Sequence, residues 1–150
     1  MMTATLRSNK PFSAERVMAA ADALEIIFPA TKTRKAARLL AFWLAKKGGT
    51  ATRNALSNFA NELSDGVQDQ HGVRFKYSRR NLYMTVLRTL LDMGFIQKNV
   101  PTWDSSRRRT VYVYSRNIFD IPQKPPSVGF WRLAYYTCRK WNDMFLEKKD

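Results

Sequence analysis

The sequence of 150 residues predicts a mainly α-helical fold that carries one small β-hairpin. Apolar side chains recur at helical spacing in several segments, and two short runs are rich in β-branched and aromatic residues. Hydrophobic residues make up 45% of the chain, enough for a folded domain with a substantial core. We expect helices over residues 13–28, 31–47, 52–63, 78–93 and 130–147, and strands over 95–98 and 110–114.

The predicted helix 78–93 has clear signals at both of its ends. Ser78 has an N-cap side chain, and Gly94 stands where a C-cap glycine is expected. At about 100° per residue, one arc of this helix is apolar and the opposite arc is polar. The apolar arc contains Leu82, Tyr83, Val86, Leu87, Leu90 and Met93, and the polar arc contains Asn81, Thr85, Arg88, Thr89 and Asp92.

The segment between the two predicted strands, residues 99–109, is too long for a tight two-residue turn. It contains turn-forming residues, so we expect a loop that projects from the body of the protein. This loop carries Trp103 and the run Arg107-Arg108-Arg109.

These segments together resemble the winged helix-turn-helix family. The resemblance lies in Ser78-Arg79-Arg80-Asn81-Leu82, Val86-Leu87, Leu90 and Met93-Gly94-Phe95-Ile96, and it covers about residues 32–116. It implies that the helix beginning at Ser78 enters the DNA major groove, while the 99–109 loop contacts the backbone or the minor groove. The expected architecture is therefore a mainly α winged helix-turn-helix with a small β-hairpin wing and extra N- and C-terminal helices.

The helix over 52–63, with Thr52 as its cap, corresponds in the family to the positioning helix that precedes the recognition helix. The comparison implies that Arg53 at its start meets a phosphate. Residues 64–77, which include a short strand expected over 73–77, stand where the family commonly has a tight turn. This insertion is the main departure from the family pattern.

The helices over 13–28 and 31–47 are each expected to bury one face. Ser13 caps the first and Pro29 ends it, so that it packs against the main body. The buried stripe of the second is expected to contain Ala36, Leu39, Leu40, Trp43 and Leu44. Together with the segments up to 116, these helices are predicted to form one domain over 13–116.

The two ends of the chain have a different character. Residues 1–12 are expected to be a mobile arm, and the proline-rich residues 117–128 an extended connector to the C-terminal segment 129–150. One face of the last helix is expected to contain Phe130, Trp131, Ala134, Cys138, Trp141 and Phe145. This face would either pack on the N-terminal helix or pair with its copy, or another protein, through residues 130–146.

Positive charge is concentrated in two parts of the chain. The formal net charge is +14, of which +6 lies in residues 31–50 and +8 in residues 73–116. Clusters of arginine at a helix start and in a loop favour a polyanionic partner. The expected partner is nucleic acid, and in particular double-stranded DNA.

The residue inventory argues against catalysis and metal binding. The single cysteine, Cys138, and the single histidine, His71, provide neither a disulfide nor a metal-binding cluster. The sequence shows no phosphate-binding glycine loop and no nucleophile motif. We therefore expect a non-enzymatic protein without cofactor or metal. No segment is apolar enough to span a membrane, and a cytoplasmic or nucleoid-associated location is expected.

The candidate site residues follow from the charge distribution and from the resemblance. The base-contacting candidates are Asn81, Thr85, Arg88 and Arg80. The candidates for backbone and wing contacts are Lys32, Arg34, Arg53, Tyr77, Ser78, Arg79, Trp103, Arg107, Arg108 and Arg109.

The expected role is that of a transcriptional regulator or of a replication or partition factor of a mobile element. One alternative is an RNA or single-strand binder in which Trp103, Tyr77 and Tyr83 stack on bases. Another is a winged-helix subunit of a larger nucleoprotein complex, docked through the C-terminal helix.

Overall fold

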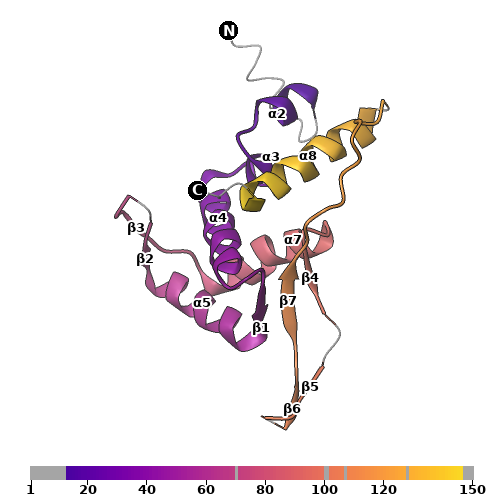
Figure 1. The fold of residues 1–150 in the computed structure, drawn as a ribbon. Helices are drawn as coiled ribbons and strands as arrows, with labels where there is room; N and C mark the ends of the chain where they lie inside the picture. The colour runs from indigo at the N-terminus through magenta and orange to yellow at the C-terminus, as the bar shows by residue number, and fades with distance from the viewer. Residues whose placement is uncertain (1–12, 70, 100–101, 107, 128, 147–150) are drawn as a thin grey trace. The chain divides into compact units, whose positions relative to one another are not determined.

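The computed structural model describes residues 13–69, 71–99, 102–106, 108–127 and 129–146. The chain is mostly helical, with small antiparallel sheets (Figure 1). Its internal contacts divide it into two compact units. The central unit comprises Lys35–Asn117, and the terminal unit combines the chain up to Arg34 with the chain from Ile118 onward.

A three-stranded antiparallel sheet lies in the central unit. Its strands are β1 (Thr50–Thr52), β7 (Val113–Arg116) and β4 (Ile96–Lys98), in the spatial order β1-β7-β4. Ala51 pairs with Tyr114, and Gln97 pairs with Ser115. Strand β1 was not predicted, because three residues joined to a distant strand leave little periodic pattern in the sequence.

The segment between β4 and β7 forms a second hairpin. Strands β5 (Thr102–Asp104) and β6 (Arg109–Val111) pair with Trp103 opposite Thr110. This β5–β6 hairpin extends beyond the three-stranded sheet (Figure 1). The described part of residues 99–109 projects as predicted, but the prediction of a loop throughout this segment is wrong.

The helices of the central unit match the predicted ranges closely. Helix α4 (Thr31–Lys46) has its first residues in the terminal unit, and α5 (Arg53–Asp65) lies wholly in the central unit. A third, continuous helix consists of α6 (Arg79–Asn81), a π-helical segment (Leu82–Leu87) and α7 (Arg88–Asp92). The Thr52 hydroxyl accepts the N–H of Ala55 at 3.2 Å. Trp43 packs on Phe59 with ring centroids 4.8 Å apart, but Trp43 and Leu39 of the predicted buried stripe are only half-buried.

The helix over 79–92 buries four of the six residues of the predicted apolar arc, and Tyr83 is only half-buried. Leu82, Val86, Leu87 and Leu90 are buried. Met93, however, is 40% exposed, because the helix ends at Asp92 and Met93 forms its C-cap. The N–H of Arg88 donates to the carbonyl of Tyr83, five residues earlier, which marks a wider π-helical turn.

The insertion after α5 forms a small hairpin. Its strands are β2 (Val67–Gln68) and β3 (Arg74–Phe75), so the predicted strand over 73–77 is shorter than expected. The carboxylate of Asp69 accepts a 2.5 Å hydrogen bond from Lys35 and 2.9 Å bonds from the N–H groups of His71 and Val73. The bond from Lys35, together with these N–H groups, lowers the pKa of Asp69 to about 2.

We expect the acid stability of the central unit to depend on Asp69. Because the folded carboxyl has a lowered pKa, its ionised form contributes stability above roughly pH 4, and this contribution is lost as the pH falls toward about 2. Asp69→Asn should lower the urea midpoint at neutral pH, and the difference from the wild type should shrink on acidification. Asp65→Asn, which changes an exposed carboxylate, is the control. A constant difference across the acid range would contradict the assignment.

The terminal unit contains the helices from both ends of the chain. They are α2 (Ala14–Ala19), α3 (Ala23–Ile27) and α8 (Gly129–Leu146). The single helix predicted over 13–28 is wrong. Asp22 caps α3 by accepting the N–H of Glu25 at 3.2 Å, and the Glu25 carboxylate accepts the N–H of Ala21 at 3.0 Å. This reciprocal capping stabilises a new helix start in place of a continuous helix.

Helix α8 buries only part of the predicted face, in which Ala134, Cys138 and Phe145 are half-buried. Tyr135 and Trp141 are buried, whereas Phe130 and Trp131 are 58% and 61% exposed. The buried face also contains Asn142, whose side chain exchanges two 2.9 Å hydrogen bonds with the backbone of Phe119. Apolar periodicity alone does not predict the burial of this polar residue, because its hydrogen bonds are made with a distant part of the chain.

Within the terminal unit, α8 packs on α2 and α3 (Figure 1), as one of the two predicted alternatives stated. Leu133 and Tyr136 of α8 contact a buried cluster of Val17, Ala20 and Ile26. Residues 117–127 contain no helix or strand. The predicted arm over 1–12 lies outside the described residues. None of the helices in the described part of the chain is long and apolar enough to cross a membrane.

Candidate nucleic-acid interface

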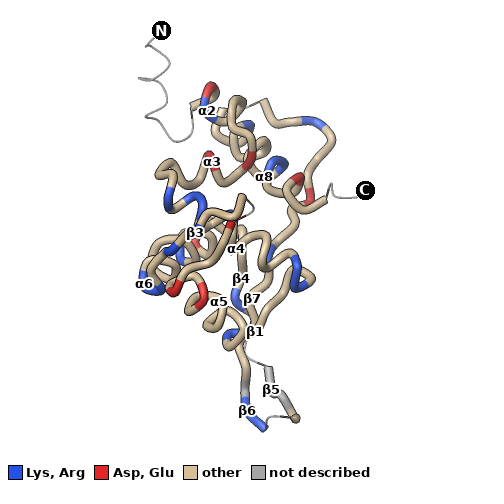
Figure 2. The backbone as a smooth tube through the Cα atoms, turned by 90° about the vertical axis from the view of Figure 1, so that its left-hand side faces the viewer, with Lys and Arg blue, Asp and Glu red and all other residues tan. Residues whose placement is uncertain are grey.

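A groove of about 700 Å³ opens on the surface of the central unit. It is formed by the start of α5, by the helix over 79–92 and by the strands β4, β6 and β7. Its lining residues are Thr52, Arg53, Asn54, Ser57, Arg79, Tyr83, Lys98, Arg109, Val111, Tyr112 and Tyr114. Four of them are cationic and none of these lining residues is acidic. Lys and Arg residues are also visible along α6, the sheet and β6 in Figure 2.

Aromatic rings hold most of these cations in place. The Lys98 ammonium lies 4.4 Å from the Tyr112 ring centroid and 5.9 Å from that of Tyr114. The Arg53 guanidinium lies 5.6 Å from the Tyr112 centroid, on the same small group of rings. Cation–π contacts of this kind orient a positive charge without neutralising it. Among the described residues, no carboxylate forms an ion pair with either Lys98 or Arg53.

Arg53 is positioned by the local structure at the junction of β1 and α5. Thr52 caps the helix, so Arg53 is its first residue, and the Arg53 N–H donates to the Tyr112 carbonyl at 2.9 Å. This bond ties the start of α5 to the residue that connects β6 and β7. A cation at the positive end of a helix is unfavourable for the isolated protein, and a bound anion relieves that repulsion.

Arg79 connects two helices at the edge of the groove. Its guanidinium donates to the Ser57 carbonyl at 3.1 Å and to the Asn61 side chain at 2.9 Å, and it lies 5.0 Å from the Tyr83 ring centroid. Arg79 therefore fixes the start of α6 against α5 while it contributes charge to the groove. The Ser78 hydroxyl accepts the N–H of Asn81 at 3.1 Å, which confirms its predicted role as a helix cap.

Burial raises the pKa of the Tyr114 phenol, and the neighbouring Tyr83 adds to this effect while Arg53 opposes it. The ring is therefore neutral at physiological pH. A neutral phenol in the groove adds no negative charge that would repel an anion.

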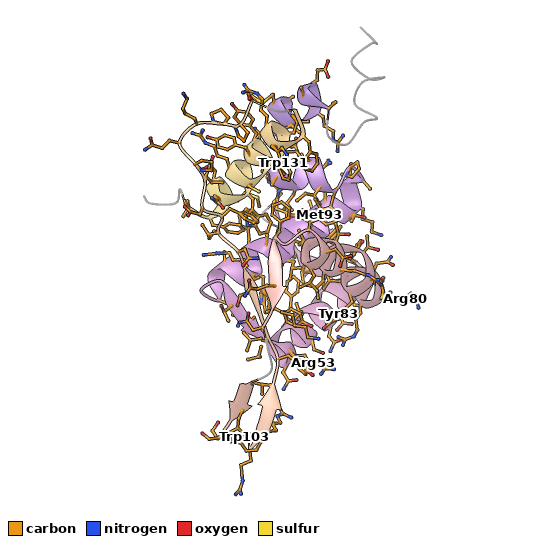
Figure 3. All side chains as sticks on the ribbon, turned by 90° about the vertical axis from the view of Figure 1, so that its right-hand side faces the viewer. Arg53, Arg80, Tyr83, Met93, Trp103 and Trp131 are labelled. Atoms are coloured by element: carbon orange, nitrogen blue, oxygen red, sulfur yellow. The ribbon has the colours of Figure 1, made fainter. Side chains whose placement is uncertain are left out.

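A second face of the helix over 79–92 points toward solvent. Arg80, Asn81, Thr85 and Arg88, the predicted base-contacting residues, are all exposed. Arg88 forms a loose pair with Asp92, with a nitrogen–oxygen distance of 3.8 Å. In Figure 3, Tyr83 lies on the side of Arg53, whereas Arg80 projects from the outer side of the helix. The helix thus presents one edge to the groove and another edge to solvent.

The structure separates the other predicted contact residues. Trp103 is 63% exposed on the β5–β6 hairpin, at the far end of the central unit in Figure 3. Arg108 is exposed and has a left-handed backbone φ of 56°, typical of a tight turn. Arg107 lies outside the described residues. Tyr77 is only 6% exposed, so its prediction as a contact or stacking residue is wrong.

Lys32 and Arg34 belong to the terminal unit. Arg34 donates to the carbonyls of Phe28 and Pro29 at 3.2 Å each, which ties the start of α4 to the end of α3. Lys32 is exposed. The two residues are thus assigned to a different unit from the residues that line the groove, all of which belong to the central unit.

Sequence reasoning missed Lys98 and Tyr112 as site residues. Lys98 is paired with Tyr114 in the sheet register, and Tyr112 lies two residues before Tyr114, between β6 and β7. Alternate residues of a strand share a face, so this arrangement follows once the register is known. The sequence contained the alternation of tyrosines over 112–114 but not the register that places Lys98 beside them.

In the part of the chain that the structure describes, no group of three His, Cys, Asp or Glu side chains is arranged to hold a metal ion. Comparisons of the chain with protein-family models, curated proteins and solved structures found no match.

Proposed function

We propose that the central unit is a winged helix-turn-helix that binds double-stranded DNA without catalysing a reaction. The order of its elements supports this proposal: α4, β1, α5, the inserted β2–β3 hairpin, the helix over 79–92, β4, the β5–β6 hairpin and β7. In this interpretation α5 positions the helix over 79–92, that helix enters the major groove, and the β5–β6 hairpin is the wing. The sheet order β1-β7-β4 fits the same arrangement.

The observation that carries the proposal is the cationic groove. Arg53, Arg79, Lys98 and Arg109 line it together, and no acidic residue does. A duplex backbone brought between the start of α5 and the hairpin would meet cations that are already oriented. Contacts of this kind set the register of the protein on DNA and leave base reading to the exposed side of the helix.

The aromatic residues favour phosphate binding over base stacking. Tyr77 is buried, and the Tyr83 and Tyr112 rings already face Arg79, Arg53 and Lys98. Single-strand binding needs ring faces that are open to bases. Trp103 has the exposure that stacking requires, so single-strand binding through the hairpin is the second candidate.

The proposed biological role is regulation of transcription, or replication or partition of a mobile element, through a specific duplex site. The exposed Phe130 and Trp131 of α8 support a further candidate, a subunit that docks on a nucleoprotein complex through the terminal unit.

The test is fluorescence anisotropy over a salt series with duplex DNA, single-stranded DNA and structured RNA of equal length. If the four groove cations and the exposed Arg108 meet phosphates, log affinity for the duplex should fall against log salt with a slope of about −4.5. Tightest binding to single strands or to RNA would overturn the proposal in favour of stacking. The absence of binding to all three at physiological salt would favour a protein partner.

We expect Arg88 and Arg108 to play different parts in this binding. Arg88 lies on the exposed side of the helix, so Arg88→Ala should relax sequence preference by about 1–3 kcal/mol at one base pair. Arg108 lies in the hairpin turn, so Arg108→Ala should weaken all duplexes alike and make the salt slope less steep by about 1. Affinities for a panel of duplexes at two salt concentrations would measure both effects. Equal loss across all sequences for both variants would contradict this division.

A further inference from the structure

An exposed methionine stands in the middle of the helix proposed to enter the major groove. Met84 is 52% exposed, although a large apolar side chain on a solvent-facing helix side contributes nothing to the core. It lies within the π-helical segment, between Arg80 and Arg88 in the sequence. The sequence gives no sign of its exposure, because an apolar residue is not expected on a polar arc.

The geometry of the helix places Met84 in the same row as the two arginines. Arg80, Met84 and Arg88 are spaced four residues apart, and in a regular α-helix each step of four rotates the row by about 40°. The π-helical segment, closed by bonds between residues five apart, turns less per residue, so this row stays closer to a straight line. All three side chains are exposed.

The row also borders the groove. Arg79 and Tyr83 line the groove, and each is followed one position later by a member of the row, Arg80 or Met84. One residue corresponds to a rotation of about 100° in an α-helix, so the row lies between the groove edge and the edge that carries Asn81 and Thr85. If the groove holds a phosphate backbone, this row is the part of the helix that faces the base edges.

We propose that Met84 contacts the 5-methyl group of a thymine in the major groove, so that this methyl group becomes a determinant of sequence specificity. The thymine methyl is the only apolar group on the major-groove edge of a base pair, and apolar side chains read it by contact. The flanking Arg80 and Arg88 are suited to guanine. The inference rests on the proposed function and restricts it to DNA, because uracil lacks this methyl group and the narrow A-form major groove of RNA excludes side chains.

The test replaces thymine by deoxyuridine in the duplex that the protein selects from a random library. This substitution removes one methyl group and leaves the base pairing unchanged. We expect one replacement to weaken binding by about fourfold, the loss that corresponds to one methyl group removed from a buried contact. Met84→Ala should weaken binding to the thymine duplex by a similar factor and make the protein insensitive to that replacement. Met84→Leu should keep the discrimination.

Met93→Ala is the matched control, because Met93 is 40% exposed at the C-terminal end of the same helix. It should retain the full difference between thymine and deoxyuridine. Binding to a preferred duplex without a deoxyuridine effect at any position would overturn this inference and leave the proposed function intact. Duplex binding without any preferred site would overturn the inference and the proposed specific role, and would leave duplex binding itself intact. An equal loss on both duplexes for Met84→Ala would overturn it too. Failure to bind any duplex would overturn both.

Discussion

Removal of two groove cations at once, in Arg53→Ala/Lys98→Ala, is expected to lower duplex affinity by roughly 50- to 100-fold at about 0.1 M salt. Both cations lie on the Tyr112 ring, at 5.6 and 4.4 Å from its centroid, and so are oriented before DNA arrives. Each lost phosphate contact should make the salt slope less steep by about one, so the double variant should lose about two. Fluorescence anisotropy with one duplex over a salt series measures both quantities.

A control with the same change in charge separates the groove from the general positive charge of the protein. Lys46 and Lys76 are exposed residues of the central unit that do not line the groove. Lys46→Ala/Lys76→Ala removes two positive charges, as the groove variant does, and should change affinity only through long-range electrostatics, by a few-fold at most. If the two double variants lose affinity equally, the groove is not the binding site. Thermal unfolding of both variants would show that the loss of the contacts with Tyr112 has not unfolded the unit.

Local signals accounted for most of the helices. Ser78 and Thr52 both cap the helices that they were predicted to cap, because capping depends on one side chain and the N–H three residues later. The buried residues of α5, such as Leu56, Phe59 and Leu63, follow directly from helical spacing. The break between α2 and α3 was missed, although its signal, Asp22 followed three residues later by Glu25, is present in the sequence.

Features that depend on distant parts of the chain could not be predicted from local patterns. Strand β1 exists because Thr50–Thr52 pairs with residues 113–115. The buried face of α8 depends on the hydrogen bonds of Asn142 with Phe119, 23 residues away. Without this partner, burial of an asparagine is unfavourable, and the sequence does not show where the partner lies.

The residues of the candidate site also differ in whether local sequence signals could identify them. Arg53, Arg79 and Arg109 were selected from charge clustering and from the resemblance, and all three line the groove. Lys98 and Tyr112 were missed, because their proximity depends on the strand register. Tyr77 was selected wrongly, because an aromatic residue before a helix cap gives no sign of its burial; its N–H donates to the Leu63 carbonyl at 3.1 Å.

Truncation of the fully buried tryptophan, Trp141→Ala, is expected to destabilise the terminal unit by about 3–5 kcal/mol. Trp141 has no exposed surface, and its ring packs edge-on against Phe145 with centroids 5.0 Å apart. Its removal would leave a large cavity beneath α8, and the lost contacts and the cavity both lower the free energy of unfolding. Urea unfolding followed by near-UV circular dichroism measures the loss.

Trp131→Ala provides the matched control, because Trp131 lies on the same helix but is 61% exposed. The same chemical change there should alter stability by no more than about 0.5 kcal/mol. The apolar pattern of the sequence placed both tryptophans on one buried face, so the two variants distinguish the predicted face from the observed one. Equal destabilisation would favour the predicted face. Because every residue that lines the groove belongs to the central unit, Trp131→Ala should also retain duplex affinity, and a loss there would show that the terminal unit takes part in binding.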